Sequence, residues 1–362
     1  MLIIEDHLVQ EVLSMRDCID AMELAFSDLA NGSAVNHPRQ RYKVPADLHA
    51  PGYFANIIPG AIPRLGVAAL RTDSAISREK VVDGVRRLEF EYPDGRSWGF
   101  VLLYSLETGR PLAIIHDFSM SGIRVGATNG AALRALSRKD SKVVGLYGSG
   151  NEAGRNLEAV CCVRDIRLCK VFSPNPTHRE NFAREMGEKL GIEVQAVDAP
   201  GKVVQDSDIV LCMTNSGEPL FDGNDLVPGQ TVVTVVNSDQ MHRRSEVDET
   251  TFIRSDLIGI SSRSTAVNNN QRELLDLIDD KRISWDKVVE LGEVLAGKRP
   301  GRTRPDQLIY FKPNTGVGIQ FAAAGAIVYE ACRKLKKGRE LPDEWFGADV
   351  KGWLDKGFSP SP

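Results

Sequence analysis

A glycine-rich turn, Gly148-Ser149-Gly150-Asn151-Glu152-Ala153, follows an apolar run and precedes a helical pattern. Glycine at 148 lets the backbone turn sharply, and glycine at 150 lets it approach a bound group without a Cβ in the way. Ala153 is small enough for the helix to lie close to the strand. The free amides that open this helix attract a phosphate group. The spacing therefore predicts a dinucleotide-binding turn.

The end of the next expected strand bears on the choice of dinucleotide. No carboxylate stands there to bind a ribose 2′-hydroxyl and repel a 2′-phosphate. Hydroxyl, amide and guanidinium groups occur instead, on Ser173, Asn175, Thr177 and Arg179. We therefore predict that NADP(H) is preferred, with NAD(H) possible, and that these four residues surround the phosphate. The alternative is that Arg179 only occupies an exposed helical turn.

Four arginines lie where a merely solvated charge is less expected. Arg39 and Arg41 flank one glutamine, Arg71 ends an apolar run, and Arg124 stands among small residues. Guanidinium groups that a fold brings together bind a carboxylate in bidentate fashion. For any one of these arginines an ion pair at the surface or between domains is the alternative, and spacing alone does not decide.

Alternating strands and helices surround the glycine-rich turn. We expect a first strand in the apolar run that begins at Ser141 and ends at the turn, helices at 152–163 and 177–190, and further strands at 166–172, 193–197, 208–213, 231–236 and 257–260. Continuous apolar strands that alternate with helices are typical of a parallel sheet covered on both faces. The middle of the chain is therefore predicted to be α/β, with a Rossmann-type doubly wound parallel sheet.

The first 125 residues have a different pattern. Ser14 is placed to cap a helix that stops at Gly32, and antiparallel strands are expected at 53–58, 65–70, 97–105 and 111–116. Further helices are expected at 268–280, 285–295 and 316–335. We predict an α+β domain for substrate binding and dimerisation, made of 1–125 with 316–362, beside an NAD(P)-binding domain at 126–315.

Composition narrows the class of protein. The chain has 362 residues and a net charge of −4, which gives no electrostatic reason to bind nucleic acid or an anionic membrane. The six cysteines are scattered through apolar segments and form no Cys-x-x-Cys pair, as expected for a reducing compartment. No apolar run is long enough to cross a membrane, and the histidines lack metal-ligand spacing. We expect a cytoplasmic protein without a metal.

Several further motifs occur in one order along the chain. They are Thr108-Gly109-Arg110-Pro111-Leu112-Ala113 with Asp117, Ser121-Gly122-Ile123-Arg124, the glycine-rich turn, Thr214-Asn215-Ser216, and Asn237-Ser238-Asp239 ahead of Glu246. Together they resemble the ornithine cyclodeaminase and mu-crystallin family, which also includes alanine dehydrogenases and imine reductases.

The resemblance implies a homodimer and chemistry at the Cα–N bond of a small amino acid, its imine or the related 2-oxo acid. Matched position by position, it implies that Arg39, residue 71 and Arg124 hold the substrate carboxylate, with Arg41 as the competing match for Arg39. It also implies that Asp239 handles protons and that Thr214 contributes to cofactor binding.

This sequence departs from the family at position 71, where Arg71 replaces the expected lysine. Arginine stays charged at any working pH and can only bind an anion, so proton transfer falls more heavily on Asp239 or on a further group that the sequence does not identify. We therefore expect an NAD(P)H-dependent oxidoreductase, either an amino-acid dehydrogenase or an imine reductase. The alternatives are a deaminating cyclase of the ornithine cyclodeaminase type and a non-catalytic NADP(H)-dependent binding protein. His116 and Asp117 form either a proton relay or a hydrogen-bonded pair.

Overall fold

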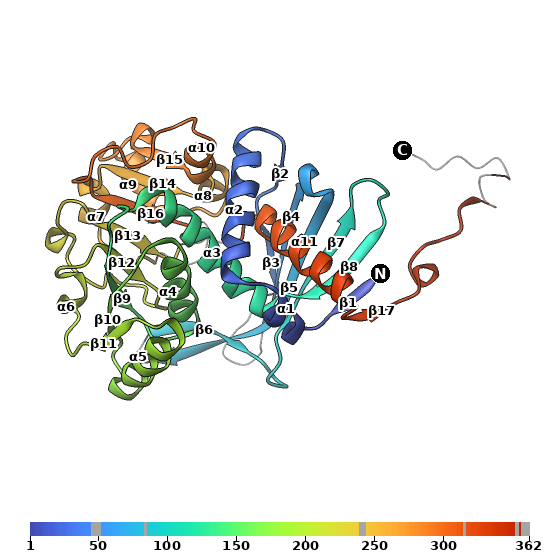
Figure 1. The fold of residues 1–362 in the computed structure, drawn as a ribbon, viewed down its shortest axis with the longest axis horizontal. Helices are drawn as coiled ribbons and strands as arrows, with labels where there is room; N and C mark the ends of the chain where they lie inside the picture. Colours follow the sequence, from blue (N-terminus) through green and yellow to red (C-terminus); the bar gives the residue numbers. More distant parts are fainter. Residues whose placement is uncertain (45–51, 83–84, 239–243, 314–315, 352–354, 356–362) are drawn as a thin grey trace.

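The computed structural model describes residues 1–44, 52–82, 85–238, 244–313, 316–351 and 355. These residues form two sheets with long helices between them (Figure 1). The first sheet is built mostly from the N-terminal part of the chain, and the second from the middle part.

The second sheet has the order β11-β10-β9-β12-β13-β16-β14-β15, and neighbouring strands are parallel throughout. Its strands are β9 (Val143–Tyr147), β10 (Leu168–Phe172), β11 (Glu193–Ala196), β12 (Ile209–Cys212), β13 (Thr231–Thr234), β14 (Leu257–Ile260), β15 (Val288–Glu290) and β16 (Ile309–Lys312). The strand order reverses direction between β9 and β12, which is where doubly wound sheets bind their ligands. The predicted Rossmann-type sheet is confirmed.

Short and long helices connect these strands. They are α4 (Asn151–Val163), α5 (Pro176–Leu190), α6 (Gly201–Val204), α7 (Glu249–Arg254), α8 (Arg263–Asn268), α9 (Arg272–Asp279) and α10 (Leu291–Leu295), with 3-10 turns η2 (Gly223–Asp225) and η3 (Trp285–Lys287). The helix expected at 285–295 is wrong. That stretch holds η3, β15 and α10 in succession, because Val288 and Val289 pair with β14. The helix expected at 268–280 is shorter, and β16 was not predicted.

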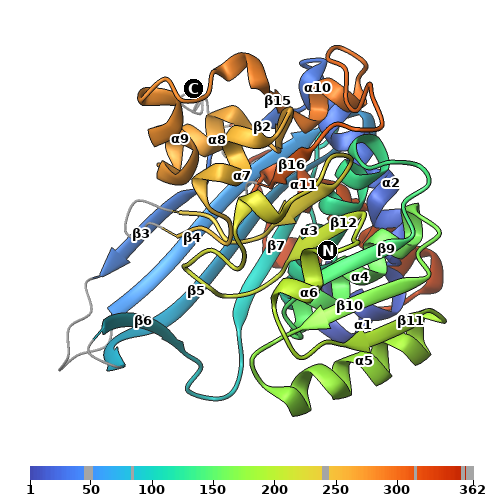
Figure 2. The same cartoon turned by 90° about the vertical axis from the view of Figure 1, so that its left-hand side faces the viewer.

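The first sheet follows the order β17-β1-β8-β7-β5-β4-β2, with β3 paired to β4 and β6 paired to β5. Its strands are β1 (Leu2–Ile4), β2 (Val35–Asn36), β3 (Gln40–Val44), β4 (Gly52–Ile62), β5 (Val67–Val82), β6 (Val85–Glu91), β7 (Trp98–Ser105), β8 (Pro111–His116) and β17 (Arg339–Glu340). The strands expected between 53 and 116 are confirmed, although β4 and β5 run further than predicted. Figure 2 shows these long strands extending beyond the helices.

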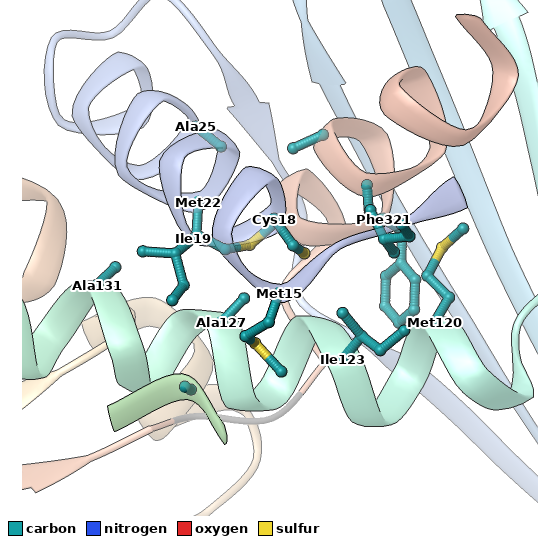
Figure 3. Close-up of a cluster of buried hydrophobic side chains, with 14 of the residues drawn as sticks. Met15, Cys18, Ile19, Met22, Ala25, Met120, Ile123, Ala127, Ala131 and Phe321 are labelled. Carbon is teal, nitrogen blue, oxygen red and sulfur yellow. The ribbon is translucent and has the colours of Figure 1, made fainter. Parts of the chain in front are cut away.

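Four helices belong to this half of the molecule: α1 (Asp6–Val12), α2 (Met15–Ala30), α3 (Phe118–Leu136) and α11 (Gly318–Leu335), with 3-10 turns η1 (Pro63–Leu65) and η4 (Asp343–Trp345). Ser14 caps α2 as predicted, because its side chain accepts a hydrogen bond from the Asp17 amide. Figure 3 shows Met15 and Ile19 of α2 against α3, and Phe321 of α11 beside Met120 and Ile123.

Helix α3 packs on both halves, against α2 on one side and α4 on the other. Its face toward α4 is lined by glycines. A Cβ added to Gly126 would lie 2.8 Å from the carbonyl oxygen of Arg155, so the helices touch backbone to backbone. The predicted boundary between residues 125 and 126 falls inside this helix, and the domain limits stay a prediction.

Candidate active site

Arg124 lies on the first half of α3 and is buried. Its Nη1 donates a hydrogen bond to Oε1 of Gln320 over 2.9 Å, and its guanidinium lies 4.7 Å from the ring centre of Phe321. Its Nε is buried and has no hydrogen-bond partner among the residues that the structure describes. Burial, together with the nearby charge of Arg71, lowers the pKa of Arg124 to about 10, so the side chain remains charged at neutral pH. A buried cation with an unused donor is suited to receive an anion.

Arg71 lies on β5 close to the same phenylalanine, with its guanidinium 5.5 Å from the Phe321 ring centre. Its Nε donates to Oδ2 of Asp117 over 2.5 Å, and its Nη1 lies 2.9 Å from Oδ1 of Asp73. Two carboxylates therefore fix this arginine and offset its charge. An arginine fork satisfies both partners at once, which a single lysine ammonium does less well.

The structure separates Arg39 from Arg41. A Cβ added to Gly316, just before α11, would lie 3.5 Å from Cδ of Arg39, so Arg39 lies at the same end of α11 as Arg71 and Arg124. Arg41 lies further along the sheet, where its Nε donates to Oδ1 of Asn56 over 3.0 Å. The placement favours Arg39 as the third member of the arginine cluster, which we define as Arg39, Arg71 and Arg124.

The glycine-rich turn has the geometry that a dinucleotide requires. Gly148 has φ +105°, and a Cβ there would lie 2.2 Å from the carbonyl oxygen of Met213, so only glycine fits. Gly150 caps α4, and a Cβ on it would meet no atom within 4 Å. Ala153 is buried against the sheet. The open side of Gly150 and the amides of α4 fit a pyrophosphate.

The turn and the arginine cluster are adjacent. A Cβ on Gly122 of α3 would lie 3.0 Å from Nδ2 of Asn151 and 3.6 Å from Oε1 of Glu152. Burial raises the pKa of Glu152, while the charges of Arg124 and Arg155 oppose that rise. Two features predicted independently from the sequence therefore meet at the contact between α3 and α4.

The residues expected around a 2′-phosphate gather at the end of β10. The hydroxyl of Ser149 donates to that of Ser173 over 3.0 Å, and Nη1 of Arg179 donates to the Ser173 carbonyl oxygen over 3.0 Å. The side chain of Asn175 caps α5 by accepting from the His178 amide, and Thr177 is exposed in the first turn. Asn175 thus has a structural role that the sequence prediction did not foresee.

Glu246 joins the ends of β12 and β13. Its Oε1 accepts hydrogen bonds from the amide and hydroxyl of Thr214, and its Oε2 accepts from the amides of Val235 and Val236. Burial raises the pKa of Glu246, and these hydrogen bonds oppose that rise. The buried carboxyl group of Glu246 therefore fixes Thr214, which is the residue expected to bind the cofactor.

A second buried carboxylate, Glu273, was not predicted from the sequence. Glu273 of α9 pairs with the fully buried Lys312 at the end of β16 over 2.6 Å, and its Oε1 accepts from the amide of Ser238 over 2.9 Å. Lys312 also donates to Oδ1 of Asn237. The apolar run Leu308-Ile309-Tyr310-Phe311 was the signal for β16, and a lysine directly after it marked the buried cation. Asp239, the expected proton-handling residue, lies outside the described residues.

His116 and Asp117 have separate partners. Nδ1 of His116 lies 3.5 Å from Oδ1 of Asp6, and its Nε2 lies 3.3 Å from the Ser97 carbonyl oxygen, whereas Asp117 binds Arg71. Neither the relay nor the hydrogen-bonded pair expected from the sequence is formed.

The described residues contain no group of three or more His, Cys, Asp or Glu side chains that could hold a metal ion. Within the same ranges, no helix has the length and apolar character needed to cross a membrane.

The chain matches proteins of one family. A model described as the ornithine cyclodeaminase/mu-crystallin family matches residues 80–336. A Rhizobium meliloti protein named as a dehydrogenase is 34% identical over 242 residues, which cover 66% of this chain and 72% of that protein. Iminosuccinate reductase of Paracoccus denitrificans is 24% identical over 343 residues, covering 94% of this chain and 99% of that protein.

A solved structure has the same fold along nearly the whole chain. Delta(1)-pyrroline-2-carboxylate reductase of Thermococcus litoralis, in complex with NADH and L-proline, superposes with a TM-score of 0.81 and 27% identity. The match covers 94% of this chain and 100% of that structure.

Proposed function

The chain belongs to the ornithine cyclodeaminase/mu-crystallin family, and we propose that within it the protein is an NAD(P)H-dependent oxidoreductase that reduces the imine of a small amino acid. The observation that carries the proposal is Arg124: a buried guanidinium whose Nε has no hydrogen-bond partner within the described part of the chain, beside the turn that fits a dinucleotide. The names of the relatives support a reductase that acts on a C=N bond.

Arg124 and Arg39 bind the substrate carboxylate, and Arg71, held by Asp73 and Asp117, shapes the charge beside them. Fixing the carboxylate orients the neighbouring carbon, which is the positioning contribution to catalysis. When bound, the nicotinamide supplies the hydride. Asp239 holds the proton that the reaction transfers at nitrogen, an effect typically worth about 10²- to 10⁴-fold.

The cofactor is held by Gly148, Ser149, Gly150, Asn151, Glu152, Ala153 and Thr214, and NADP(H) is preferred over NAD(H). The preference is supported by Ser173, Thr177 and Arg179 at the end of β10, where no carboxylate repels a 2′-phosphate. Because Asn175 already caps α5, its contribution is limited to an exposed amide nitrogen.

The protein is a cytoplasmic homodimer that associates through its first domain, 1–125 with 316–362, whereas 126–315 binds the cofactor. The dimer is supported by large apolar side chains on the first sheet that remain exposed, Tyr42, Val44 and Trp98. Six free cysteines, four of them buried, fit a reducing compartment.

Initial rates of NADPH oxidation test the activity. The substrates are Δ1-pyrroline-2-carboxylate and 2-oxo acids mixed with ammonium or methylamine. We expect turnover with at least one imine and its loss in Arg124→Met, with Arg134→Met, a half-exposed arginine on the same helix, as the matched control. NADPH binding without turnover of any imine would instead identify a binding protein, and proline formation from ornithine would identify a cyclase.

A further inference from the structure

Arg71 and Arg124 are held in different ways. Arg71 forms ion pairs with two carboxylates, which offset its charge. Within the described part of the chain, the guanidinium of Arg124 makes its hydrogen bond and its ring contact with neutral groups, the amide of Gln320 and the ring of Phe321. Neutral groups fix the position of a cation and leave its charge available for an anionic ligand.

The side-chain amide of Gln320 has one orientation that satisfies its neighbours. Its Nε2 donates to Oγ1 of Thr128 over 2.6 Å, and the Thr128 hydroxyl donates to the carbonyl oxygen of Arg124 over 2.8 Å. Because the hydroxyl proton is used on that carbonyl, Oγ1 accepts from the amide and has no second proton to give. The amide oxygen of Gln320 therefore faces Arg124, where it accepts from Nη1.

The backbone that carries Gln320 is fixed to the first sheet. The amide of Gly318 donates to Oδ1 of Asn36 over 2.6 Å, and a Cβ on Gly318 would overlap the carbonyl oxygen of Pro59. The amide of Val317 donates to Oε1 of Gln320 over 3.3 Å, and Gln320 itself is buried. The amide that holds Arg124 thus has little freedom to move.

The hydrogen bond to Gln320 bears on which edge of Arg124 meets a ligand. A guanidinium presents paired donors along its Nη1–Nη2 edge and along its Nε–Nη2 edge. Nη1 is bound to Gln320, whereas Nε is buried and lacks a hydrogen-bond partner among the described residues. The Nε–Nη2 edge is therefore the one that offers a carboxylate an unused, buried donor.

We propose that Thr128 and Gln320 are positioning residues for substrate binding. Thr128 orients the amide of Gln320, and Gln320 holds Arg124 so that its Nε–Nη2 edge receives the substrate carboxylate. This inference rests on the proposed function for the identity of the ligand, but carboxylate binding can be measured without turnover.

Calorimetric titration of the full chain saturated with NADPH tests the role of Thr128, with propionate as a carboxylate that has no group to reduce. We expect Thr128→Val to weaken propionate binding about 10-fold, because the amide of Gln320 loses the group that orients it. Thr128→Ser keeps the hydroxyl and should bind propionate as the wild-type protein does.

Ser137→Ala is the matched control for Thr128→Val. It removes a hydroxyl that donates to the carbonyl oxygen of Leu133, at the other end of α3. Propionate affinity should be unchanged in this variant. An unchanged affinity in Thr128→Val, or an equal loss in Ser137→Ala, would overturn the positioning role of Thr128.

The substitution Gln320→Glu separates positioning from packing. It keeps the size of the side chain and its bond to Arg124, but the new carboxylate offsets the charge of Arg124 inside the protein. We expect the melting temperature to be retained or raised while propionate affinity falls about 10-fold or more. Wild-type affinity in Gln320→Glu would show that the glutamine only fills space, and would overturn its positioning role.

NMR of protein labelled with ¹⁵N-arginine tests which edge binds. The Nε–H signal of Arg124 is identified by its absence in Arg124→Met. Propionate should move this proton signal downfield, because the donor gains a charge-assisted hydrogen bond. Propionate binding that leaves the signal in place would overturn the assignment of the Nε–Nη2 edge.

Kinetics separates this inference from the proposed function. In Thr128→Val the KM for the imine should rise about 10-fold with a smaller change in kcat, and Thr128→Ser should restore it. Imine reduction with wild-type KM in both Thr128→Val and Gln320→Glu would overturn the positioning roles and leave the reductase intact. Propionate binding that depends on both residues, with no imine reduced, would support the positioning roles and overturn the reductase.

Discussion

Arg71 donates from Nε to Oδ2 of Asp117 across 2.5 Å, and Asp117 is the residue that precedes α3. The pair ties β5 to the start of the helix that carries Arg124. The arginine at position 71 therefore anchors a neighbouring cation besides contributing its own charge. This anchoring role gives a physical reason for arginine where the family resemblance implies lysine, because the fork reaches Asp73 and Asp117 together.

A double-mutant cycle tests this anchor. Arg71→Met leaves Asp117 buried without its cation, and we expect a loss of about 3–5 kcal/mol in the free energy of unfolding. Asp117→Asn added to Arg71→Met should recover a large part of that loss, since the unpaired charge is gone. Urea unfolding of the four proteins measures the coupling. Additive effects would show that the pair does not act as an anchor.

The geometry of Arg124 predicts a kinetic effect that charge alone does not explain. Arg124→Lys keeps the cation but loses the planar contact with Phe321 and the bond to Gln320. We expect kcat/KM for the imine to fall about 10- to 100-fold, equivalent to about 1.5–3 kcal/mol. Arg134→Lys, on the same helix but half-exposed beside Asp20, is the control and should change little. Equal values for both variants would contradict the proposed role.

Arg179 is predicted to set the choice between cofactors. Arg179→Met should lower the ratio of kcat/KM with NADPH to that with NADH by about 10-fold, because a charge-assisted contact to the 2′-phosphate is lost. Arg184→Met, exposed on the same helix beside Asn181, serves as control. Better wild-type activity with NADH than with NADPH would remove the basis for the preference.

The Glu273–Lys312 pair predicts a pH-dependent stability. Burial raises the pKa of Glu273, but the Lys312 ammonium and the hydrogen bond from Ser238 outweigh it, so the pKa lies below its ordinary value of 4.5. Stability from this carboxylate is therefore present above pH 4.5 and lost as pH falls through the lowered pKa.

The substitution Glu273→Gln tests the predicted direction of this pH dependence. At pH 7 we expect a loss of about 3–5 kcal/mol, because Lys312 stays buried without its partner. The difference from the wild-type protein should shrink at pH values below the lowered pKa, as the urea midpoint will show. Asp279→Asn, at an exposed pair on the same helix, should have a small effect at both pH values. A difference that does not change with pH would contradict the assignment.

The contact between α3 and α4 predicts that alanine substitutions at two glycines have different effects on stability. Gly126→Ala places a methyl group 2.8 Å from the Arg155 carbonyl oxygen, so we expect a loss of about 1–3 kcal/mol. Gly154→Ala on α4 meets nothing closer than Sδ of Met186 at 3.5 Å and should be neutral or stabilising by up to about 1 kcal/mol. Thermal denaturation compares the two. Similar melting temperatures would show that the helices have room to separate.

The elements read best from the sequence are those with a strong local signal. The strand Leu257–Ile260 and the strand Pro111–His116 match the predicted ranges, because each is an apolar run bounded by turn residues. The short strands β15 and β16, of three and four residues, were not predicted, since short apolar runs do not distinguish a strand from a helix. What makes them strands is the pairing with β14, which the local sequence does not encode.

The candidate site also contains features with a local sequence signal and features that depend on distant residues. The glycine-rich turn could be predicted because the positive φ at Gly148 is a local backbone requirement. The pairing of Arg71 with Asp117 could not be predicted, because Asp117 comes 46 residues later in the chain. The Glu273–Lys312 pair was missed for the same reason: the two residues lie on different elements, and only the fold places their charges together in the core.

The glycine face of α3 has a mechanical consequence. A Cβ on Gly126 would meet the backbone of α4, and one on Gly130 would meet the side chain of Ile19 on α2, so α3 is closely packed between both halves. Hinge motion at this helix would require the two backbones to part, and the spacing between Arg124 and the dinucleotide turn is thus established when the chain folds. Ligands then enter a site whose dimensions are already set, and little ordering remains for them to impose.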